Sequence, residues 1–593
     1  MVTADAGREA AFTAASGFDM VIGEKEVRLE PLPLALERLA RDSGSAPAVS
    51  FAGAASGGVG LTYAQLDDRA RVLARRIQER CPDDGRVAIM CPHDEHYIVA
   101  FLACLYAGVV AVPLHAPEFF RGQERLRAVL ADSGPALAVT TTGAERSVRG
   151  LLGDVAPATE VLTADTVDEG ERRPLLREPD HGADRIAYLQ YTSGSTGDPA
   201  GVCITHGNLA ATAWQLGSHF MPARTVVSWV PLFHDMGLIC GIVGPLSAGI
   251  HTVHLSPLQF IRDPFQWLKA ISDHRADWSV APNFALRHCV DRISEERARS
   301  LDLSSLRVLA IGGEMVRSET VAAFADAFAS CGLAPGALIP SYGLAEATLT
   351  VAVAPRGEGT RVRMFDRAGL ERGNAVEVPD GGSGAPATGL VGCARLMEGV
   401  VVRIVSPETR AALPDGRVGE VWVRGPNCAQ RYWNSPQDRS PRFDARIASP
   451  AGEADTPWLR TGDSGFLHEG RLYLNGRIDD MFVVRGSNHF PEDIEASIEG
   501  AVPTARAAVL AFDPAADEDG PRVVALVETG GRPPGPGSPE REEVIAAVRR
   551  AAHRDHGLAL ADVRIVRKGG LARTTSGKLR RGTCRERYLA GVL

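Results

Sequence analysis

The sequence has no pair of cysteines at the C-x-x-C spacing, although it contains 10 cysteines among 593 residues. They lie singly and mostly in apolar surroundings, which is typical of buried free thiols in a reducing compartment rather than of a disulfide framework. Blocks of lysine and arginine are also missing. The 64 basic residues are outnumbered by 73 acidic ones, which gives a net charge of −9. We therefore expect no nucleic-acid partner.

No basic segment followed by an apolar one opens the chain, so we expect no signal peptide and a cytoplasmic protein. Long apolar runs are almost absent. The exception is residues 97–114, which contain no charged side chain but are interrupted by Gly108 and Pro113. A buried helix followed by a buried strand accounts for this segment better than a membrane span does. The sequence also lacks tandem repeats and a Walker loop.

Hydroxyl residues and glycines alternate where the sequence reads Leu-Gln-Tyr-Thr-Ser-Gly-Ser-Thr-Gly, from residue 189 to 197. Glycine lets the backbone approach a ligand closely, and successive N–H groups can then turn inward as a nest for an anion. This pattern predicts a loop that binds the polyphosphate of a nucleotide. The alternative is a Ser/Gly-rich surface linker. The candidate binding residues are Thr192, Ser193, Gly194, Ser195, Thr196 and Gly197.

Short apolar strands alternate with amphipathic helices over much of the chain, which predicts an α/β fold with a mostly parallel sheet. The texture changes near residue 354, where glycine, proline and charged residues fill residues 355–390. Beyond them the pattern is mainly β, and the last 115 or so residues again read as a compact α/β unit. We expect helices over residues 32–42, 63–81, 125–133, 263–274, 318–330 and 540–553, and strands over 226–230, 278–280, 308–312, 400–405, 419–423, 471–474, 507–512 and 523–529.

Several further residues could carry chemistry. His234 lies in an apolar, aromatic stretch and could line a ligand cavity, although a buried core histidine is the simpler interpretation. Tyr342 offers a flat face for a nucleobase, and Glu346 could reach a phosphate-bound divalent cation. Asp463 could accept hydrogen bonds from both ribose hydroxyls, or it could form an Asx turn. Lys578 ends a flexible segment and could be a catalytic cation or a solvated side chain.

Taken together and in this order, these motifs resemble those of the adenylate-forming superfamily, and within it most resemble the fatty acyl-AMP ligases. The resemblance covers roughly residues 30–583. The segments that carry it begin at Leu189 (Leu-Gln-Tyr-Thr-Ser-Gly-Ser-Thr-Gly), Pro231 (Pro-Leu-Phe-His-Asp-Met-Gly-Leu), Ser256 (Ser-Pro-Leu-Gln-Phe), Pro282 (Pro-Asn-Phe-Ala), Tyr342 (Tyr-Gly-Leu-Ala-Glu-Ala-Thr) and Val484 (Val-Arg-Gly-Ser-Asn-His-Phe-Pro-Glu-Asp-Ile-Glu).

The resemblance implies an ATP-dependent and Mg²⁺-dependent ligase that activates a carboxylic acid, such as a fatty acid, to an acyl-adenylate with release of pyrophosphate. By the same resemblance, Lys578 bridges the carboxylate and the α-phosphate, and His234 lies near the carboxylate. Glu346 binds Mg²⁺, with Thr196 as a second ligand. The implied nucleotide-binding residues are Thr192 to Gly197 for the phosphates, Gly313, Glu314, Ser341, Tyr342 and Gly343 around the adenine, Asp463 on the ribose, and Arg477 at a phosphate.

The resemblance also implies a large N-terminal domain of two α/β subdomains and a β-rich subdomain, followed by a small, mobile α+β domain. Asp479 matches the family hinge, about which the last domain rotates between two reactions. The expected divisions are a flexible lead (1–25), an adenylation domain (26–475, with an insertion at about 355–390 and a β-rich part at about 391–475), a hinge (476–480) and a C-terminal lid (481–593).

The insertion, which includes residues 361–376, resembles the one that separates acyl-AMP ligases from CoA ligases, although a tolerated surface loop would look the same. It implies that the acyl acceptor is the phosphopantetheine thiol of a carrier protein supplied in trans. Three alternatives remain: an acyl-CoA or aryl-CoA ligase, an amino-acid-activating domain with Asp235 on the substrate, and a degenerate nucleotide-binding protein. Ala200 is the main departure, because most family members have lysine there.

Overall fold

The computed structural model describes most of the chain. The described residues are 17–53, 60–119, 123–166, 174–193, 199–220, 223–379, 387–393, 395–435, 441–448, 456–485, 487–502, 505–512, 521–530, 533–535, 537–573 and 579–593.

A first α/β sheet has the strand order β10-β9-β6-β5-β7-β8. Its strands run parallel except for β9 and β10, which form an antiparallel hairpin. The uncharged segment forms the buried helix α4 and then the buried strand β6, as predicted. The elements are α3 (Tyr63–Gln78), β5 (Arg86–Ile89), α4 (Glu95–Ala107), β6 (Val110–Pro113), α5 (Glu124–Ser133), β7 (Leu137–Thr140), α6 (Glu145–Val155), β8 (Glu160–Thr163), β9 (Ile186–Ser193) and β10 (Pro199–Thr205).

A second sheet has the order β19-β16-β15-β14-β13-β11-β12-β3-β4, and its strands from β15 to β3 run parallel. One large hydrophobic core contains residues of both sheets. The elements are α2 (Leu32–Asp42), β3 (Pro47–Phe51), β4 (Gly60–Thr62), α7 (His206–Phe220), β11 (Thr225–Ser228), α8 (Asp235–Leu238), α9 (Gly244–Ala248), β12 (His251–His254), α10 (Pro257–Arg262), α11 (Phe265–Asp273), β13 (Trp278–Ala281), α12 (Asn283–Arg292), α13 (Glu295–Ala298), β14 (Val308–Ile311), α14 (Ser318–Phe328), β15 (Leu338–Gly343), β16 (Thr350–Val353) and β19 (Arg395–Leu396).

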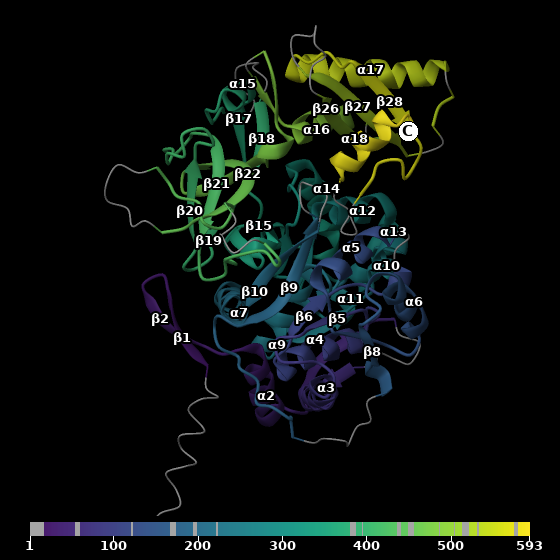
Figure 1. Cartoon of the computed structure of the whole chain (residues 1–593). Coiled ribbons are helices and arrows are strands. Elements are labelled where there is room, and N and C mark those ends of the chain that lie inside the picture. Colours follow the sequence, from purple (N-terminus) through teal and green to yellow (C-terminus); the bar gives the residue numbers. More distant parts are fainter. Residues whose placement is uncertain are drawn as a thin grey trace, which may run out of the picture.

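A third sheet is mainly antiparallel and has the order β17-β18-β23-β22-β21-β20. The predicted insertion contributes its outer strand β17 and the short helix α15, which together lie beside the C-terminal unit (Figure 1). The elements are β17 (Val362–Asp366), α15 (Arg367–Glu371), β18 (Ala387–Cys393), β20 (Val401–Val405), β21 (Gly419–Arg424), β22 (Leu459–His468) and β23 (Arg471–Arg477).

The C-terminal unit has its own three-layered build, with the sheet β26-β27-β28 between helices and separate apolar clusters on its two faces. Figure 1 shows it above the N-terminal sheets. A 3₁₀ turn, Ile478–Asp480, connects it to β23. The elements are β24 (Phe482–Val484), β25 (Ser487–His489), α16 (Pro491–Ala501), β26 (Ala505–Phe512), β27 (Arg522–Thr529), α17 (Pro539–His556), β28 (Asp562–Val566) and α18 (Arg581–Leu589).

The chain start differs from the predicted flexible lead of residues 1–25. The strands β1 (Phe18–Ile22) and β2 (Lys25–Leu29) form an antiparallel hairpin, and Ile22 and Leu29 pack against residues of α7. This packing compensates for the weak local signal of a short hairpin. The described residues contain no helix that is long and apolar enough to cross a membrane. All 10 cysteines are free thiols, and 9 of them are buried, as the sequence predicts.

Candidate active site

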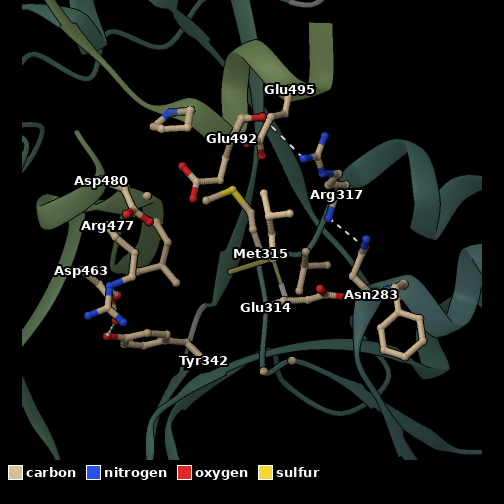
Figure 2. A pocket seen from close by; sticks show the side chains of 18 of the residues that line it. Asn283, Glu314, Met315, Arg317, Tyr342, Asp463, Arg477, Asp480, Glu492 and Glu495 are labelled. Atoms are coloured by element: carbon tan, nitrogen blue, oxygen red, sulfur yellow. Dashed lines mark hydrogen bonds and ion pairs between the residues drawn. The ribbon is translucent and has the colours of Figure 1, made fainter. Parts of the chain in front are cut away.

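A cavity of about 1790 Å³ lies between the N-terminal sheets and the C-terminal unit. Its floor is formed where the parallel strands β13, β14 and β15 end, which is where open α/β sheets bind ligands. Figure 2 shows Tyr342, Asp463 and Arg477 on one wall and Glu314 on another. Many of the residues proposed from the sequence line this cavity: Thr192, Gly313, Glu314, Ser341, Tyr342, Gly343, Glu346, Asp463, Arg477 and Asp479.

Tyr342, Asp463 and Arg477 form a polar cluster from three strands. The hydroxyl of Tyr342, at the end of β15, donates a hydrogen bond of 2.6 Å to Asp463 Oδ2. Asp463 and Arg477 are register partners on β22 and β23, and Arg477 Nε lies 3.5 Å from Asp463 Oδ1. Burial raises the pKa of Asp463, while Arg477 and Tyr342 oppose that shift. The cluster therefore holds a partly buried carboxylate that lines the cavity and can accept a hydrogen bond from a ligand hydroxyl.

Glu346 is a buried carboxylate on the same wall, 6% exposed. The chain folds back tightly around it: a Cβ on Gly343 would clash with the Leu349 carbonyl oxygen, so only glycine fits there. Tyr432 donates a hydrogen bond of 2.7 Å to Glu346 Oε1, and Arg442 Nη2 lies 3.6 Å from the same oxygen. A carboxylate at a polar cavity wall is the kind of oxygen ligand that Mg²⁺ takes together with substrate phosphates. The residues present therefore fit such an ion.

The loop after β14 brings the backbone close to β15. Gly313 has φ +77°, and a Cβ on Gly312 would lie 2.7 Å from the Ser341 carbonyl oxygen, so side chains are disfavoured at both positions. The Glu314 carboxylate accepts a hydrogen bond of 2.5 Å from the Phe284 backbone N–H. This loop therefore forms a thin, rigid wall next to Tyr342.

The predicted phosphate loop connects β9 to β10. Thr192 pairs with Ala200 across this hairpin, Ser193 pairs with Pro199, and both Thr192 and Ala200 line the cavity. Gly194, Ser195, Thr196 and Gly197 lie outside the described residues. The structure thus brings the described stem of the loop to the cavity.

The two predicted catalytic residues outside this wall are placed differently. His234 occupies the N-cap position of α8 without a side-chain capping bond; its neighbours Asp235 and Met236 line the cavity, but His234 is not among the described residues that do. Lys578 lies outside the described residues. Arg573 and Leu579, on either side of it, pair with one another and line the cavity.

The segment predicted as the hinge, residues 476–480, also borders the cavity. Arg581 of α18 forms ion pairs of 2.9 Å with Asp480 and 2.8 Å with Glu492. The C-terminal unit contacts the rest of the chain through Arg317, whose Nη2 donates to the Glu492 carbonyl oxygen at 3.5 Å (Figure 2). Arg367 of the insertion also donates to the Asp555 carbonyl oxygen, at 2.7 Å.

Among the polar residues of this cavity that the sequence did not indicate are Arg125, Tyr432 and Arg442. Tyr432 and Arg442 belong to the stretch before β22, and only the tertiary fold brings them to Glu346. For Arg125 the sequence predicts a helix but no site. A basic residue in the first turn of that helix was the available signal, since helix N-termini favour acidic residues.

Two α/β sheets and a β-rich unit, with a small C-terminal unit over a polar cavity, define the architecture of an adenylate-forming enzyme. The profile described as "AMP-binding enzyme" matches residues 36–433. FadD26 of Mycobacterium marinum, named a long-chain-fatty-acid–AMP ligase, is 40% identical over 89% of this chain and 91% of its own. The chain therefore belongs to the AMP-binding enzymes and, among them, to the fatty acyl-AMP ligases.

Two further similarities are informative. FadD21 of Mycobacterium tuberculosis, which carries a provisional name as a fatty-acid–CoA ligase, is 37% identical over 89% of this chain and 92% of its own. A solved structure from a study of fatty acyl-adenylate ligases of E. coli and L. pneumophila has a TM-score of 0.81 and 30% identity, covering 95% of this chain and 98% of that one.

Proposed function

We propose that the protein joins a fatty acid to AMP. In this reaction a carboxylate oxygen attacks the α-phosphorus of ATP, the bond to the β-phosphate oxygen breaks, and pyrophosphate leaves. The observation that carries the proposal is the cluster of Tyr342, Asp463 and Arg477 beside Glu346 in one cavity. Such a reaction requires little covalent chemistry from the protein, so positioning and charge stabilisation dominate.

The nucleotide would lie along the wall from β14 to β22. Asp463 would accept from the ribose hydroxyls through the oxygen that Tyr342 does not use. Gly313 and Glu314, with Ser341, Tyr342 and Gly343, would surround the adenine. Thr192, Ser193, Gly194, Ser195, Thr196 and Gly197 would hold the β- and γ-phosphates, and Arg477 would contact a phosphate from the opposite side.

Glu346 would hold Mg²⁺, with Thr196 as a second protein ligand. The ion, when bound, would offset negative charge on the phosphates. Tyr432 would keep the Glu346 carboxylate oriented through its hydrogen bond of 2.7 Å. Lys578 would neutralise charge as the phosphorus becomes pentacoordinate, and His234 would lie near the acyl carboxylate.

We further propose that residues 26–475 form the adenylation domain, residues 481–593 a lid, and residues 476–480 a hinge that turns at Asp479. The lid would rotate after adenylation and admit the acceptor. A carrier-protein phosphopantetheine thiol would then attack the acyl carbonyl, with loss of the thiol proton and departure of AMP. The contact of Arg367 with the lid supports a restrained rotation that disfavours free CoA. The provisional name of FadD21 keeps CoA as the second candidate acceptor.

Hydroxylamine trapping over a panel of fatty, aryl and amino acids tests the first step. Fatty hydroxamates should form only with ATP and Mg²⁺, and no product with any acid would refute the proposal. Intact-mass detection of acylated holo-carrier, beside a CoA reaction, tests the second step. Efficient acyl-CoA formation without carrier loading would refute the proposed acceptor.

Lys578→Ala tests the role given to the lid. We expect pyrophosphate exchange to fall by about 100-fold or more, because one charge at the reacting phosphorus is lost. Lys568→Ala, at an exposed lysine of the same unit, is the control. Exchange at nearly the unsubstituted rate in the Lys578 variant would show that another group supplies the charge.

A further inference from the structure

Arg125 lies at the cavity next to the stem of the phosphate hairpin. It is in the first turn of α5, and it lines the cavity together with Thr192, Pro199 and Ala200. Its Nη2 donates a hydrogen bond of 3.4 Å to the Tyr191 carbonyl oxygen. The guanidinium is thus held against the strand that leads into the loop.

A contact at the C-terminal end of α5 also holds the helix, and with it Arg125, against the hairpin. The Tyr191 hydroxyl donates a hydrogen bond of 2.6 Å to Asp132 Oδ2, near the last turn of α5. A Cβ on Gly201 would lie 2.8 Å from the Tyr191 ring, so this glycine allows the ring to lie flat across the hairpin. Helix and hairpin therefore form one rigid body that carries Arg125 at the cavity.

The charge of Arg125 is not neutralised by a carboxylate in the part of the chain that the structure describes. Its exposed neighbour Glu124 forms no ion pair with it, and the one hydrogen bond that its side chain makes with a described residue goes to a neutral carbonyl. Arg127, two residues further along α5, instead pairs with Asp154 at 2.7 Å. Burial and the positive charge of Arg580 lower the pKa of Arg125. Arg125 from α5 and Arg580 from the C-terminal unit thus both line the cavity, which brings two positive charges to its wall.

This arrangement is unfavourable without an anion. A cation in the first turn of a helix also opposes the helix dipole. Residues 189–202 of the hairpin contain no lysine or arginine of their own. A polyphosphate between the hairpin and Arg580 would relieve the repulsion and pair with Arg125, which has no carboxylate partner among the described residues; Asp198 of the hairpin lies outside them.

We propose that Arg125 is a phosphate-binding residue, which holds the β- and γ-phosphates of ATP and then the pyrophosphate. This inference rests on the proposed adenylation reaction, and it identifies Arg125 as the residue that supplies positive charge at the site of the ATP phosphates. The planar guanidinium can donate two charge-assisted hydrogen bonds to one phosphate group. Arg125 thereby replaces the positive charge that Ala200 does not provide.

The test compares Arg125→Ala with Arg127→Ala, an exchange on the same helix that leaves the cavity intact. In the Arg125 variant we expect the Kd for pyrophosphate, by calorimetry, and the KM for ATP to rise about 10-fold to 100-fold. The KM for the fatty acid should change less than about 2-fold, and the thermal midpoint should stay close to that of the parent. Arg127→Ala should change none of these values.

Rescue makes the test specific. Arg125→Lys should recover part of the affinity, and the double variant Arg125→Ala with Ala200→Lys should recover more of it, because a cation returns to the hairpin. Unchanged pyrophosphate and ATP affinity in Arg125→Ala, or equal losses in Arg127→Ala, would overturn the inference. If no acid is adenylated, the proposed function fails, but direct pyrophosphate binding still decides the role of Arg125.

Discussion

The Tyr342 hydroxyl donates a hydrogen bond of 2.6 Å to the Asp463 carboxylate, across 121 residues of sequence. The bond joins the end of a parallel α/β sheet to the β-rich unit. Burial raises the pKa of Asp463, and the hydrogen bond from Tyr342 opposes that rise because it favours the ionised carboxylate. This wall of the cavity therefore depends on a contact between two separate sheets.

Tyr342→Phe should weaken this wall. Loss of a hydrogen bond to this partly buried carboxylate should reduce the free energy of unfolding by about 1 to 3 kcal/mol and raise the KM for ATP by about 10-fold. Denaturant unfolding and steady-state kinetics measure both effects. Tyr188→Phe is the control, because the buried Tyr188 hydroxyl has no hydrogen-bond partner among the described residues. Equal effects of the two changes would contradict a special role for the Tyr342 bond.

Asp493 should make the stability of the lid junction depend on pH. Burial raises its pKa from 3.8 to about 7, with Glu492 and Glu371 adding to the shift and Arg367 and Arg317 opposing it. The folded protein thus keeps a proton that the unfolded chain releases. The free energy of unfolding should therefore fall, by about 2 to 4 kcal/mol, as the pH rises from 4 to 7.

Asp493→Asn should remove the fall in the free energy of unfolding between pH 4 and 7, because asparagine does not ionise. We expect a higher thermal midpoint at pH 7.5 and a flatter profile between pH 4 and 7 than in the parent protein. Differential scanning calorimetry across this range measures both. An unchanged slope in the variant would mean that other groups produce the pH dependence.

Arg581 should be essential to the folded lid. Its side chain is 16% exposed and forms ion pairs with three carboxylates, those of Asp480, Glu492 and Glu495. Arg581→Ala would leave these charges together without their cation and should cost about 3 to 5 kcal/mol. Hydrogen exchange of α16 and β26 should show the loss, whereas the exposed Arg550 can be changed to alanine as a neutral control. Protection equal to that of the parent would refute this role.

Arg367→Ala should change the choice of acceptor. The substitution removes the 2.7 Å hydrogen bond to the Asp555 carbonyl oxygen and so loosens the lid. We expect the preference for holo-carrier over CoA to fall by about 10-fold, measured as the ratio of the two thioester products. Arg372→Ala, at an exposed residue of the same insertion, should leave the ratio unchanged. A ratio unaffected by either change would show that the insertion does not govern the acceptor.

Local patterns predicted individual elements well. Leucine periodicity gives α2 with its observed bounds, and the uncharged run gives α4 and β6. Local patterns cannot predict the order of strands in a sheet, because that order depends on pairs far apart in the sequence. For example, β3 pairs with β12, some 200 residues later. The hairpin β1–β2 was missed for the same reason: its order depends on packing against α7.

For the site too, local patterns indicated some residues, whereas others depend on contacts between distant parts of the chain. Glycine and hydroxyl spacing pointed to the phosphate hairpin, and the stem residue Thr192 does line the cavity. Tyr432 and Arg442 have no local signature, since their meaning arises from distances of 2.7 and 3.6 Å to Glu346. The roles given to Lys578 and His234 remain predictions.

The strand β10 lies at one end of its sheet, yet its outer edge is not open. The Trp433 backbone N–H donates to the Gly201 carbonyl oxygen at 2.6 Å, and the Cys203 N–H donates to that of Arg431 at 3.1 Å. Exposed strand edges invite pairing between molecules. The short segment that carries Tyr432 to the cavity therefore also covers this strand edge, which disfavours self-association. Variants selected in that segment for altered catalysis should be screened for aggregation.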